Sequence, residues 1–441
     1  GNPPHPVRIT SIGSSMGRTP DAMLRANDLH AELFLDESGQ TRLRTARAVG
    51  DVNYRDSSRT TAVASNLDAD AVQEIIVLTG PDTSVTQAGS TIAGNHITLR
   101  AKRRSVEVQG AGTFDHDIAL AQDPNANPGQ LGHISTRWAD SMRFDDTLGT
   151  IECIGSVRMI STPDALTRDT LNADRVTINL TPMPSSDPIA GGQNRQRELL
   201  SARASGRAEP GKDPQPASIE SRSYAVDDPE LAIGVLYLEG AQILADNQQQ
   251  TLSVPGEGAL LLLDREQDPD QPQSDRSLDG SGLTRFTWKS RMLLNRADGQ
   301  GTFNGSVKVD HKSLTSNQIA TLTTDTLVAR FQAQQPEPGT GAEPSTDPTS
   351  ISTGMALQSA TATGDVRFLF NDAELLCDEA IYDAIADSLF AQSLGDTLVT
   401  YYDNTQPAPF SARTMRWDLS KEGRDRIEFN APSPIRTTPG G

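Results

Sequence analysis

Trp138, Met142 and Gly155-Ser156-Val157 return later in the chain as Trp288, Met292 and Gly305-Ser306-Val307. Each member of the second set lies 150 positions after its counterpart. Related elements occur as Gly50-Asp51-Val52 and Gly364-Asp365-Val366. A constant offset is typical of one supersecondary unit used several times, because such units stack to close a shared core. The sequence therefore predicts a repetitive molecule with a long surface rather than an enzyme built around one pocket.

Short alternating segments fill the space between these motifs. Residues 97–101 and 106–108 place apolar side chains at every second position, as half-buried strands do. Helical periodicity is scarce: only Pro20–Asn27 and Glu198–Ser205 fit short helices, and neither is long enough to build an α/β layer. The pattern predicts an all-β protein of antiparallel layers.

Composition limits the classes of function. The 441 residues carry a formal net charge of −19, and 35% of them are hydrophobic. An acidic surface repels nucleic-acid phosphates and disfavours simple adhesion to an anionic membrane, so we expect neither partner. No window approaches 18 consecutive apolar residues, so no segment is expected to span a bilayer as a helix.

Interruptions rich in Pro, Gly, Ser and Asp divide the chain into predicted modules. Such stretches bury too little apolar area to offset the entropy of ordering them, and we expect disordered insertions there. The expected organisation is a lead-in (1–21), a first β module (22–118), a second (133–265, with a disordered insertion at 182–217) and a third (283–436, with a disordered insertion at 332–349).

Signals for catalysis or metal binding are weak. Residues 13–17 match the Gly-x-Ser-x-Gly pattern of hydrolases but lack the strand–turn–helix context that this motif needs. The six histidines show no metal-ligand spacing. Cys153 and Cys377 lie in apolar runs and are interpreted as buried residues; a bridge between them stays open. No cofactor, metal or catalytic residue is expected.

The order of elements in the first module resembles a known family. Residues 24–29 (Leu-x-Ala-x-x-Leu) precede Gly50-Asp51-Val52, which is followed by 64–70 (Ala-x-x-Leu-x-Ala-Asp) and 77–80 (Val-x-x-Gly). This order is similar to OstA-like domains, the periplasmic lipopolysaccharide-transport bridge proteins of the Lpt family, and to the inner-membrane-anchored periplasmic Lpt component. The third module, with 364–366 and 378–383, has the same character.

The resemblance implies an elongated, antiparallel, open jellyroll that is V-shaped and twisted. It implies a non-catalytic envelope protein, in the periplasm of a Gram-negative-type bacterium, that binds or relays lipopolysaccharide-like amphipathic lipid along an apolar groove between membranes. Partners would be other envelope transport proteins joined through strand edges, with end-to-end self-association as a further option. An anchor upstream of residue 1 is implied by the family only.

Candidate groove residues are the apolar members of alternating strands: Ile97, Leu99, Val106, Val108, Val157, Met159, Val176, Leu236, Leu238, Val307, Val309 and Phe368. The alternative for each is ordinary core. The densest basic cluster supplies headgroup candidates: Arg100, Lys102, Arg103 and Arg104. A charged hairpin tip is the alternative there. Trp138, Trp288 and Trp417 are interpreted as packing residues, with sugar stacking as the alternative.

Two other architectures compete with the groove. One is a right-handed parallel β-helix that binds or cleaves polysaccharide, which favours a coil period of about 20–30 residues. The other is a surface or adhesive β-sandwich array with sealed cores. Lipid carried by the purified protein separates both alternatives from lipid transport.

Overall fold

A computed structural model describes most of the chain as β-strands. The described residues are 7–18, 22–36, 39–56, 60–87, 89–117, 132–182, 198–208, 210–225, 227–265, 282–314, 318–333, 355–386, 388–404, 408–418 and 426–430. All regular elements within these ranges are strands, and all their pairings with a determined register are antiparallel. Among them no helix occurs that is long and apolar enough to cross a membrane. The all-β, antiparallel, jellyroll-like fold expected from the sequence is confirmed.

The chain separates into two units, residues 1–205 (unit 1) and 206–441 (unit 2), so the boundary falls inside the expected second module. The strands of unit 1 are β1 (Val7–Arg18), β2 (Ala22–Leu35), β3 (Thr41–Asp56), β4 (Thr61–Asp70), β5 (Ile75–Thr79), β6 (Ser84–Gln87), β7 (Ser90–Arg100), β8 (Ser105–Asp117), β9 (His133–Trp138), β10 (Ser141–Asp145), β11 (Thr150–Thr162), β12 (Thr167–Leu180) and β13 (Leu199–Ser205).

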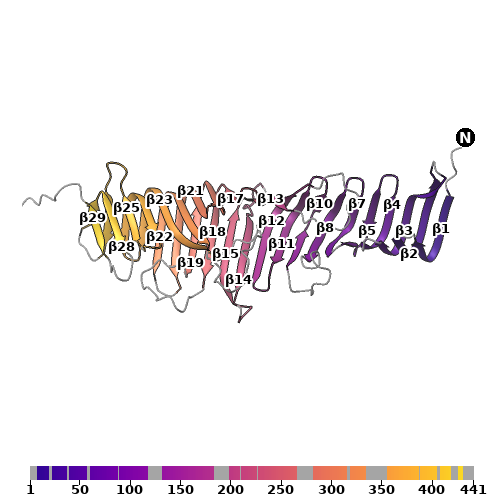
Figure 1. The fold of residues 1–441 in the computed structure, drawn as a ribbon, viewed down its shortest axis with the longest axis horizontal. Helices are drawn as coiled ribbons and strands as arrows, with labels where there is room; N and C mark the ends of the chain where they lie inside the picture. Colours follow the sequence, from indigo (N-terminus) through magenta and orange to yellow (C-terminus); the bar gives the residue numbers. More distant parts are fainter. Residues whose placement is uncertain are drawn as a thin grey trace, which may run out of the picture. The chain divides into compact units, whose positions relative to one another are not determined.

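Unit 1 is a meander in which the long strands follow one another from β1 onward (Figure 1). The short strands β5 and β6 each pair with β4 and β7, and β9 and β10 each pair with β8 and β11. The long strands run through two sheets. The first half of β11 pairs with β10 in what we call sheet A, and its second half pairs with β9 in sheet B. The two sheets of unit 1 therefore share their long strands and meet where those strands bend.

Each of these bends is a β-bulge. It lies at the repeated sequence motif, in which a glycine is followed by an aspartate or a serine. In β11 the register shifts between Ile154 and Val157, and both Gly155 (φ 88°) and Ser156 (φ 46°) are left-handed. Gly50 (φ 75°) and Asp51 (φ 49°) do the same in β3. Two successive left-handed residues turn the strand sharply, which strongly favours glycine at the first of them. The aligned bends of neighbouring strands form a kink line between the sheets.

Unit 2 repeats this plan. Its strands are β14 (Ala217–Tyr224), β15 (Ala232–Gly240), β16 (Gln242–Asp246), β17 (Thr251–Pro255), β18 (Gly258–Asp264), β19 (Gly282–Trp288), β20 (Arg291–Asn295), β21 (Gln300–Ser313), β22 (Ile319–Ala333), β23 (Met355–Phe370), β24 (Ala373–Asp383), β25 (Ser388–Gln392), β26 (Val399–Asp403), β27 (Phe410–Ala412), β28 (Thr414–Asp418) and β29 (Ile427–Asn430). The first half of β21 pairs with β20 in sheet C, and its second half pairs with β19 in sheet D.

The two copies of the tryptophan motif occupy the same place in their units. Trp138 ends β9 opposite Gly112 of β8, and Trp288 ends β19 opposite Gly258 of β18. In both units, a Cβ added to that glycine would lie 2.5 Å from the tryptophan Cζ2. Trp417 is buried like the other two, as expected for packing residues.

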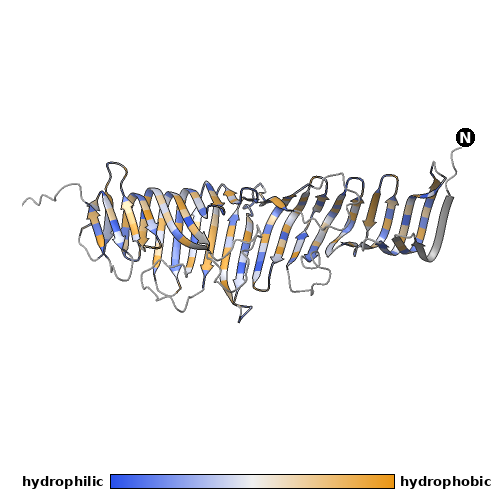
Figure 2. Ribbon diagram, in the orientation of Figure 1, coloured by the Kyte–Doolittle hydropathy of each residue, from blue (hydrophilic) through white to orange (hydrophobic). Residues whose placement is uncertain are grey.

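Alternating hydropathy sets the two faces of each sheet, visible as bands of orange and blue along the strands in Figure 2. In β15 the buried residues alternate with half-exposed ones from Ile233 to Gly240. A sheet with one buried face shows this period of two because successive side chains point to opposite faces.

Several local predictions were wrong. Of the expected short helices, residues 22–27 lie in strand β2 and residues 199–205 form strand β13, because pairing with neighbouring strands overrides a weak helical preference. Residues 7–18 of the expected lead-in form β1. The expected disordered insertion at 182–217 contains β13 and a bridge between Arg207 and Gln215. Residues 183–197 and 334–349 lie outside the described residues. The parallel β-helix is excluded for the described strands by their antiparallel pairing.

Candidate functional site

The inner face of sheet A carries a continuous row of buried apolar residues beside the kink line. Paired residues of adjacent strands form this floor row: Ala48, Leu67, Leu78, Ile97, Val108, Met142, Cys153, Val176 and Ala204. All are buried, with Ile97 and Val108 at 0% exposure. Cross-strand apolar neighbours of this kind stabilise the sheet directly.

A second apolar row lies on the same face, two residues farther from the kink line. This wall row consists of Ala31, Ala46, Ala69, Ile76, Leu99, Val106, Phe144, Ile151, Ile178 and Ala202. Only Ala46 is buried; the others are half-exposed. At ~4.8 Å between neighbouring strands, the row extends for roughly 40 Å across unit 1.

Sheet B mirrors this arrangement. Its floor residues are buried: Ala26, Val52, Ala64, Trp138, Val157 and Ala173. Its wall row crosses the strands as Leu24, Tyr54, Ala62, Val85, Ile92, Phe114, Thr136, Met159 and Leu171. Ala62 and Thr136 are buried, and the rest are half-exposed.

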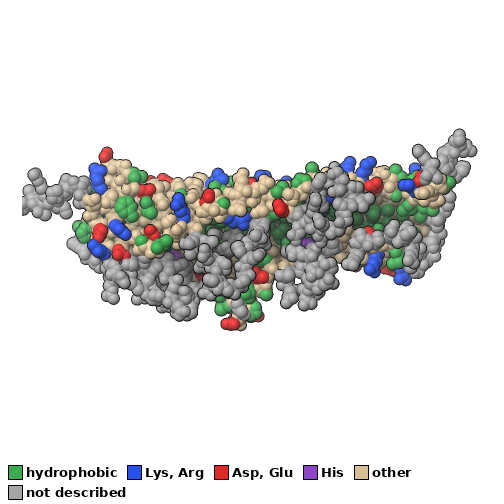
Figure 3. Space-filling model, in the orientation of Figure 1, with side chains coloured by type: hydrophobic (Ala, Val, Ile, Leu, Met, Phe, Trp, Pro, Cys, Tyr) green, Lys and Arg blue, Asp and Glu red, His purple; other side chains and the backbone are tan. Residues whose placement is uncertain are grey.

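The exposure of these rows defines an apolar trough in unit 1. Each sheet is one layer thick, so burial of both floor rows requires the sheets to pack together beside the kink line. The wall rows lie farther from that line and keep contact with solvent, so the sheets diverge there. The space-filling view shows hydrophobic side chains in a recessed band over unit 1 (Figure 3).

A polar pair lies beyond the wall of sheet B. His116 of β8 lies on the same face as Phe114, and its ring stacks on that phenyl ring with centroids 6.2 Å apart. Its Nδ1 atom lies 2.8 Å from the hydroxyl of Ser90. Burial lowers the pKa of His116 below its ordinary value, so the ring is neutral at neutral pH. The trough therefore changes from apolar to polar toward its mouth without a fixed charge at this position.

The twelve groove candidates all lie on the inner faces of the two units. Those that are buried are Ile97, Val108, Val157, Val176, Leu236, Leu238, Val307 and Phe368. Those that are half-exposed are Leu99, Val106, Met159 and Val309. The buried set forms core, and Leu99, Val106 and Met159 belong to the walls of the trough. Lipid contact by any of them stays a prediction.

The headgroup candidates lie at the hairpin between β7 and β8, at the end of sheet A. Arg100 points away from the trough and donates to Glu107, with Nη1 2.9 Å from Oε2. Arg104 pairs with Asp146. Lys102 and Arg103 are exposed in the turn. Two of the four charges are thus engaged by carboxylates, and contact of the cluster with a lipid headgroup stays a prediction.

Sequence reasoning missed several wall residues, chiefly Phe144, Ile151, Ile178 and Phe114. The signal was present in Ile151-Glu152-Cys153, where apolar residues flank an outward-facing glutamate. We interpreted that run as the setting of a buried cysteine. Only the strand pairing places Ile151 opposite Phe144 and Ile178.

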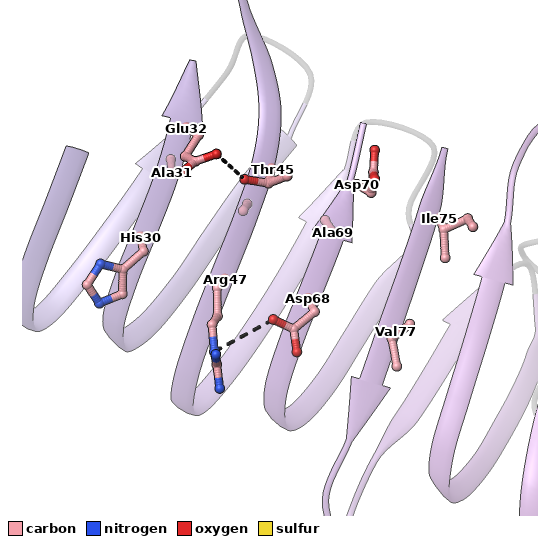
Figure 4. Close-up of a pocket in the computed structure, with 11 residues that line it drawn as sticks. His30, Ala31, Glu32, Thr45, Arg47, Asp68, Ala69, Asp70, Ile75 and Val77 are labelled. Atoms are coloured by element: carbon pink, nitrogen blue, oxygen red, sulfur yellow. Dashed lines mark hydrogen bonds and ion pairs between the residues drawn. The ribbon is translucent and has the colours of Figure 1, made fainter. Parts of the chain in front are cut away.

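The outer face of sheet A is polar. A concavity of about 650 Å³ lies over β2 to β5. Figure 4 shows its side chains, including an ion pair between Arg47 and Asp68 at 3.7 Å. The hydroxyl of Thr45 donates to Glu32 over 3.4 Å. Charged neighbours of opposite sign balance each other on this solvated face, in contrast to the apolar inner face.

Other chemistry has little support in the described residues. No cluster of His, Cys, Asp and Glu within them has the arrangement to hold a metal ion. Cys153 and Cys377 are free and buried, and burial is the main reason that the pKa of each thiol is raised to about 12. Neither is a nucleophile at neutral pH.

Comparison with solved structures gives a structural resemblance. The chain is similar to LptH from Pseudomonas aeruginosa, described as the periplasmic component, homologous to LptA, of a lipopolysaccharide transport device. The match covers 32% of this chain and 93% of LptH at 13% identity, with a TM-score of 0.22. No protein-family model and no curated protein matches. Because the TM-score is low, the fold assignment rests on strand pairing.

Proposed function

We propose that the protein is a non-catalytic envelope protein that holds amphipathic lipid in the trough of unit 1. The supporting observation is the pair of half-exposed apolar walls above a buried floor. Leaving apolar surface in contact with water is unfavourable, and a contiguous exposed patch of this kind usually marks a binding surface. An acyl chain in the trough would remove that surface from water.

The energetics favour a chain-shaped apolar ligand. Each methylene group transferred from water contributes about 0.8 kcal/mol, so an acyl chain of about ten carbons can contribute several kcal/mol after its ordering cost. The trough is long and lined mostly by aliphatic residues and alanine, with Tyr54, Phe114 and Phe144 as aromatic members, which suits an extended chain. The polar pair of His116 and Ser90 toward the mouth suits a headgroup that stays near water.

Lipopolysaccharide-like lipid, relayed between membranes in a periplasm, is the specific form of this proposal. It is supported by the order of sequence elements in the first module. Partners would join by strand addition. In unit 1, β1 pairs with β2, and no other described strand of the unit pairs with β1. An edge of this kind is a template for another chain.

A sealed adhesive β array is the main competing function. It would bury all apolar members of the alternating strands, whereas the wall rows of unit 1 remain half-exposed. Sugar stacking by the conspicuous tryptophans has less support, because Trp138, Trp288 and Trp417 are all buried.

Mass spectrometry of lipid extracted from the purified protein, together with titration by fluorescent lipopolysaccharide, tests the proposal. We expect bound acyl chains and saturable binding. Ile151→Asp puts a charge in the wall and should weaken binding at least tenfold, roughly 1.4 kcal/mol. Thr177→Asp is the matched control on the outer face of the neighbouring strand and should bind as the wild type does. Absence of lipid and of binding in the wild type would refute the proposal.

A further inference from the structure

The constant offset allows the interiors of the two units to be compared residue by residue. Thr136 and Cys153 of unit 1 correspond to Phe286 and Phe303 of unit 2. The strand pairing agrees with this correspondence. Thr136 pairs with Met159 as Phe286 pairs with Val309. Cys153 pairs with Met142 as Phe303 pairs with Met292.

The two phenylalanines connect the sheets of unit 2. Phe286 lies on β19 in sheet D, and Phe303 lies in the part of β21 that belongs to sheet C. Their rings stack with centroids 5.1 Å apart at an interplanar angle of 12°. Trp288 packs on Phe303 with centroids 5.5 Å apart. All three are buried, and the two phenylalanines fill the interior where unit 1 has a hydroxyl and a thiol side chain.

In unit 2, many residues of the row that corresponds to the wall row of sheet A are buried by other side chains of the same unit. Ile151, half-exposed in unit 1, corresponds to Gly301, which is buried. A Cβ added to Gly301 would lie 3.3 Å from Phe331 Cε2 and 3.5 Å from Phe303 Cε2. The remaining buried members of the equivalent row in sheet C are Leu252, Ala329, Tyr382, Leu389 and Trp417.

A second aromatic cluster lies farther along unit 2. Trp417 of β28 in sheet C contacts Phe368, Phe370 and Tyr401 edge-on, with centroids 6.5, 6.0 and 5.6 Å apart. These three residues belong to β23 and β26 in sheet D. Aromatic contacts between the sheets therefore recur within this unit.

We propose that lipid is confined to unit 1 and that the aromatic clusters of unit 2 exclude acyl chains from its interior. This inference rests on the proposed function of the trough. An acyl chain entering unit 2 would have to displace stacked rings that already bury the same surface, so it would gain little. The two units then share a fold but differ in whether their interiors can hold an acyl chain. This difference lies in the pair Phe286 and Phe303.

Site-specific photo-crosslinking in the full chain tests this division. A benzoylphenylalanine is placed at Ile151 or Val106 in unit 1, and at Leu294 or Leu260, half-exposed positions of unit 2. Fluorescent lipopolysaccharide is the probe. We expect adducts at the unit 1 positions at least tenfold above those in unit 2. Equal adducts in both units would overturn the inference and leave the lipid-binding proposal standing. Adducts at no position would overturn both.

Reciprocal exchange of the aromatic pair sharpens the test. Phe286→Thr combined with Phe303→Cys should raise crosslinking at Leu294. Thr136→Phe combined with Cys153→Phe should lower it at Ile151. Far-ultraviolet circular dichroism and the thermal transition establish that each variant is folded. Unchanged adduct yields in folded variants would show that the aromatic pair does not control access, whereas the crosslinks in the unexchanged chain decide the proposal without these substitutions.

Discussion

At the scale of single residues, the glycines of the kink line differ in what surrounds them. Gly155 and Gly110 have nearly the same left-handed backbone, with φ of 88° and 83°. A Cβ at Gly155 would lie 2.5 Å from the carboxyl carbon of Asp140, whereas a Cβ at Gly110 would meet nothing within 4 Å. A comparison of substitutions at Gly110 and Gly155 therefore separates the cost of backbone strain from the cost of a steric clash.

Alanine substitution at these two glycines should give different losses of stability. Gly110→Ala should lower the free energy of unfolding by about 1–2 kcal/mol, the cost of a left-handed residue with a Cβ. Gly155→Ala should lower it by about 1–3 kcal/mol more, because Asp140 must move. Urea denaturation followed by circular dichroism measures both. Equal losses would contradict the close approach at the kink.

The two thiols should be inert in the folded protein. Both are buried, and with a pKa of about 12 almost no thiolate is present at pH 8. A colorimetric disulfide reagent should therefore react with neither Cys153 nor Cys377 until a denaturant is added. Rapid reaction of the native protein at pH 8 would contradict the burial described for these residues.

At the scale of elements, alternation predicted strands well and bends poorly. Ile97, Leu99, Val106 and Val108 have the expected period of two and occupy one face. The bend at Gly155 depends on two consecutive left-handed residues, which alternation does not encode. Strand β13 was predicted as a helix because its local preference is weak, and only pairing with β12 decides its structure.

The loop between β25 and β26 depends on one carboxylate. Asp378 Oδ2 accepts hydrogen bonds from the Leu394 amide at 2.8 Å, the Ser393 hydroxyl at 2.9 Å and the Thr397 hydroxyl at 3.0 Å. These hydrogen bonds, chiefly the one from the Leu394 amide, lower the pKa of Asp378 below the ordinary value of an aspartate. The stabilisation is fully present above that value and is lost as the pH falls through the lower pKa of the folded state.

Asp378→Asn should loosen this loop at neutral pH, because an amide is a weaker acceptor than a carboxylate. Hydrogen exchange at the Leu394 amide should be faster in the variant than in the wild type at pH 7. In the wild type, the loop should keep its protection at pH 5. Loss of protection between pH 7 and 5 would contradict the direction of the pKa shift.

At the scale of the whole molecule, the repeated motif predicted equivalent structure but not equivalent interiors. The sequence offset aligns Trp138 with Trp288 and Gly155 with Gly305. The same offset aligns Cys153 with Phe303, and the consequence of that exchange becomes visible only when Phe286 is found stacked on it. Side chains from distant strands decide how open each unit is, and a linear pattern does not show which of them meet.

The two units should fold separately. Residues 1–205 and 206–441 form distinct compact units, each with its own buried rows. Produced as fragments, each should give a β-type circular dichroism spectrum and a cooperative thermal transition. Binding of fluorescent lipopolysaccharide should be retained by residues 1–205. A fragment without regular structure would contradict the division.

The kink line has a mechanical consequence. The long strands of unit 1 continue through both sheets. Their peptide bonds and the hydrogen bonds between them therefore oppose any sliding of one sheet along the other. Rotation about the row of left-handed residues leaves those bonds intact. We therefore expect the trough to widen by rotation of the two sheets about the kink line. A bulkier ligand would increase the angle between sheets A and B, while the length of the kink line stays the same.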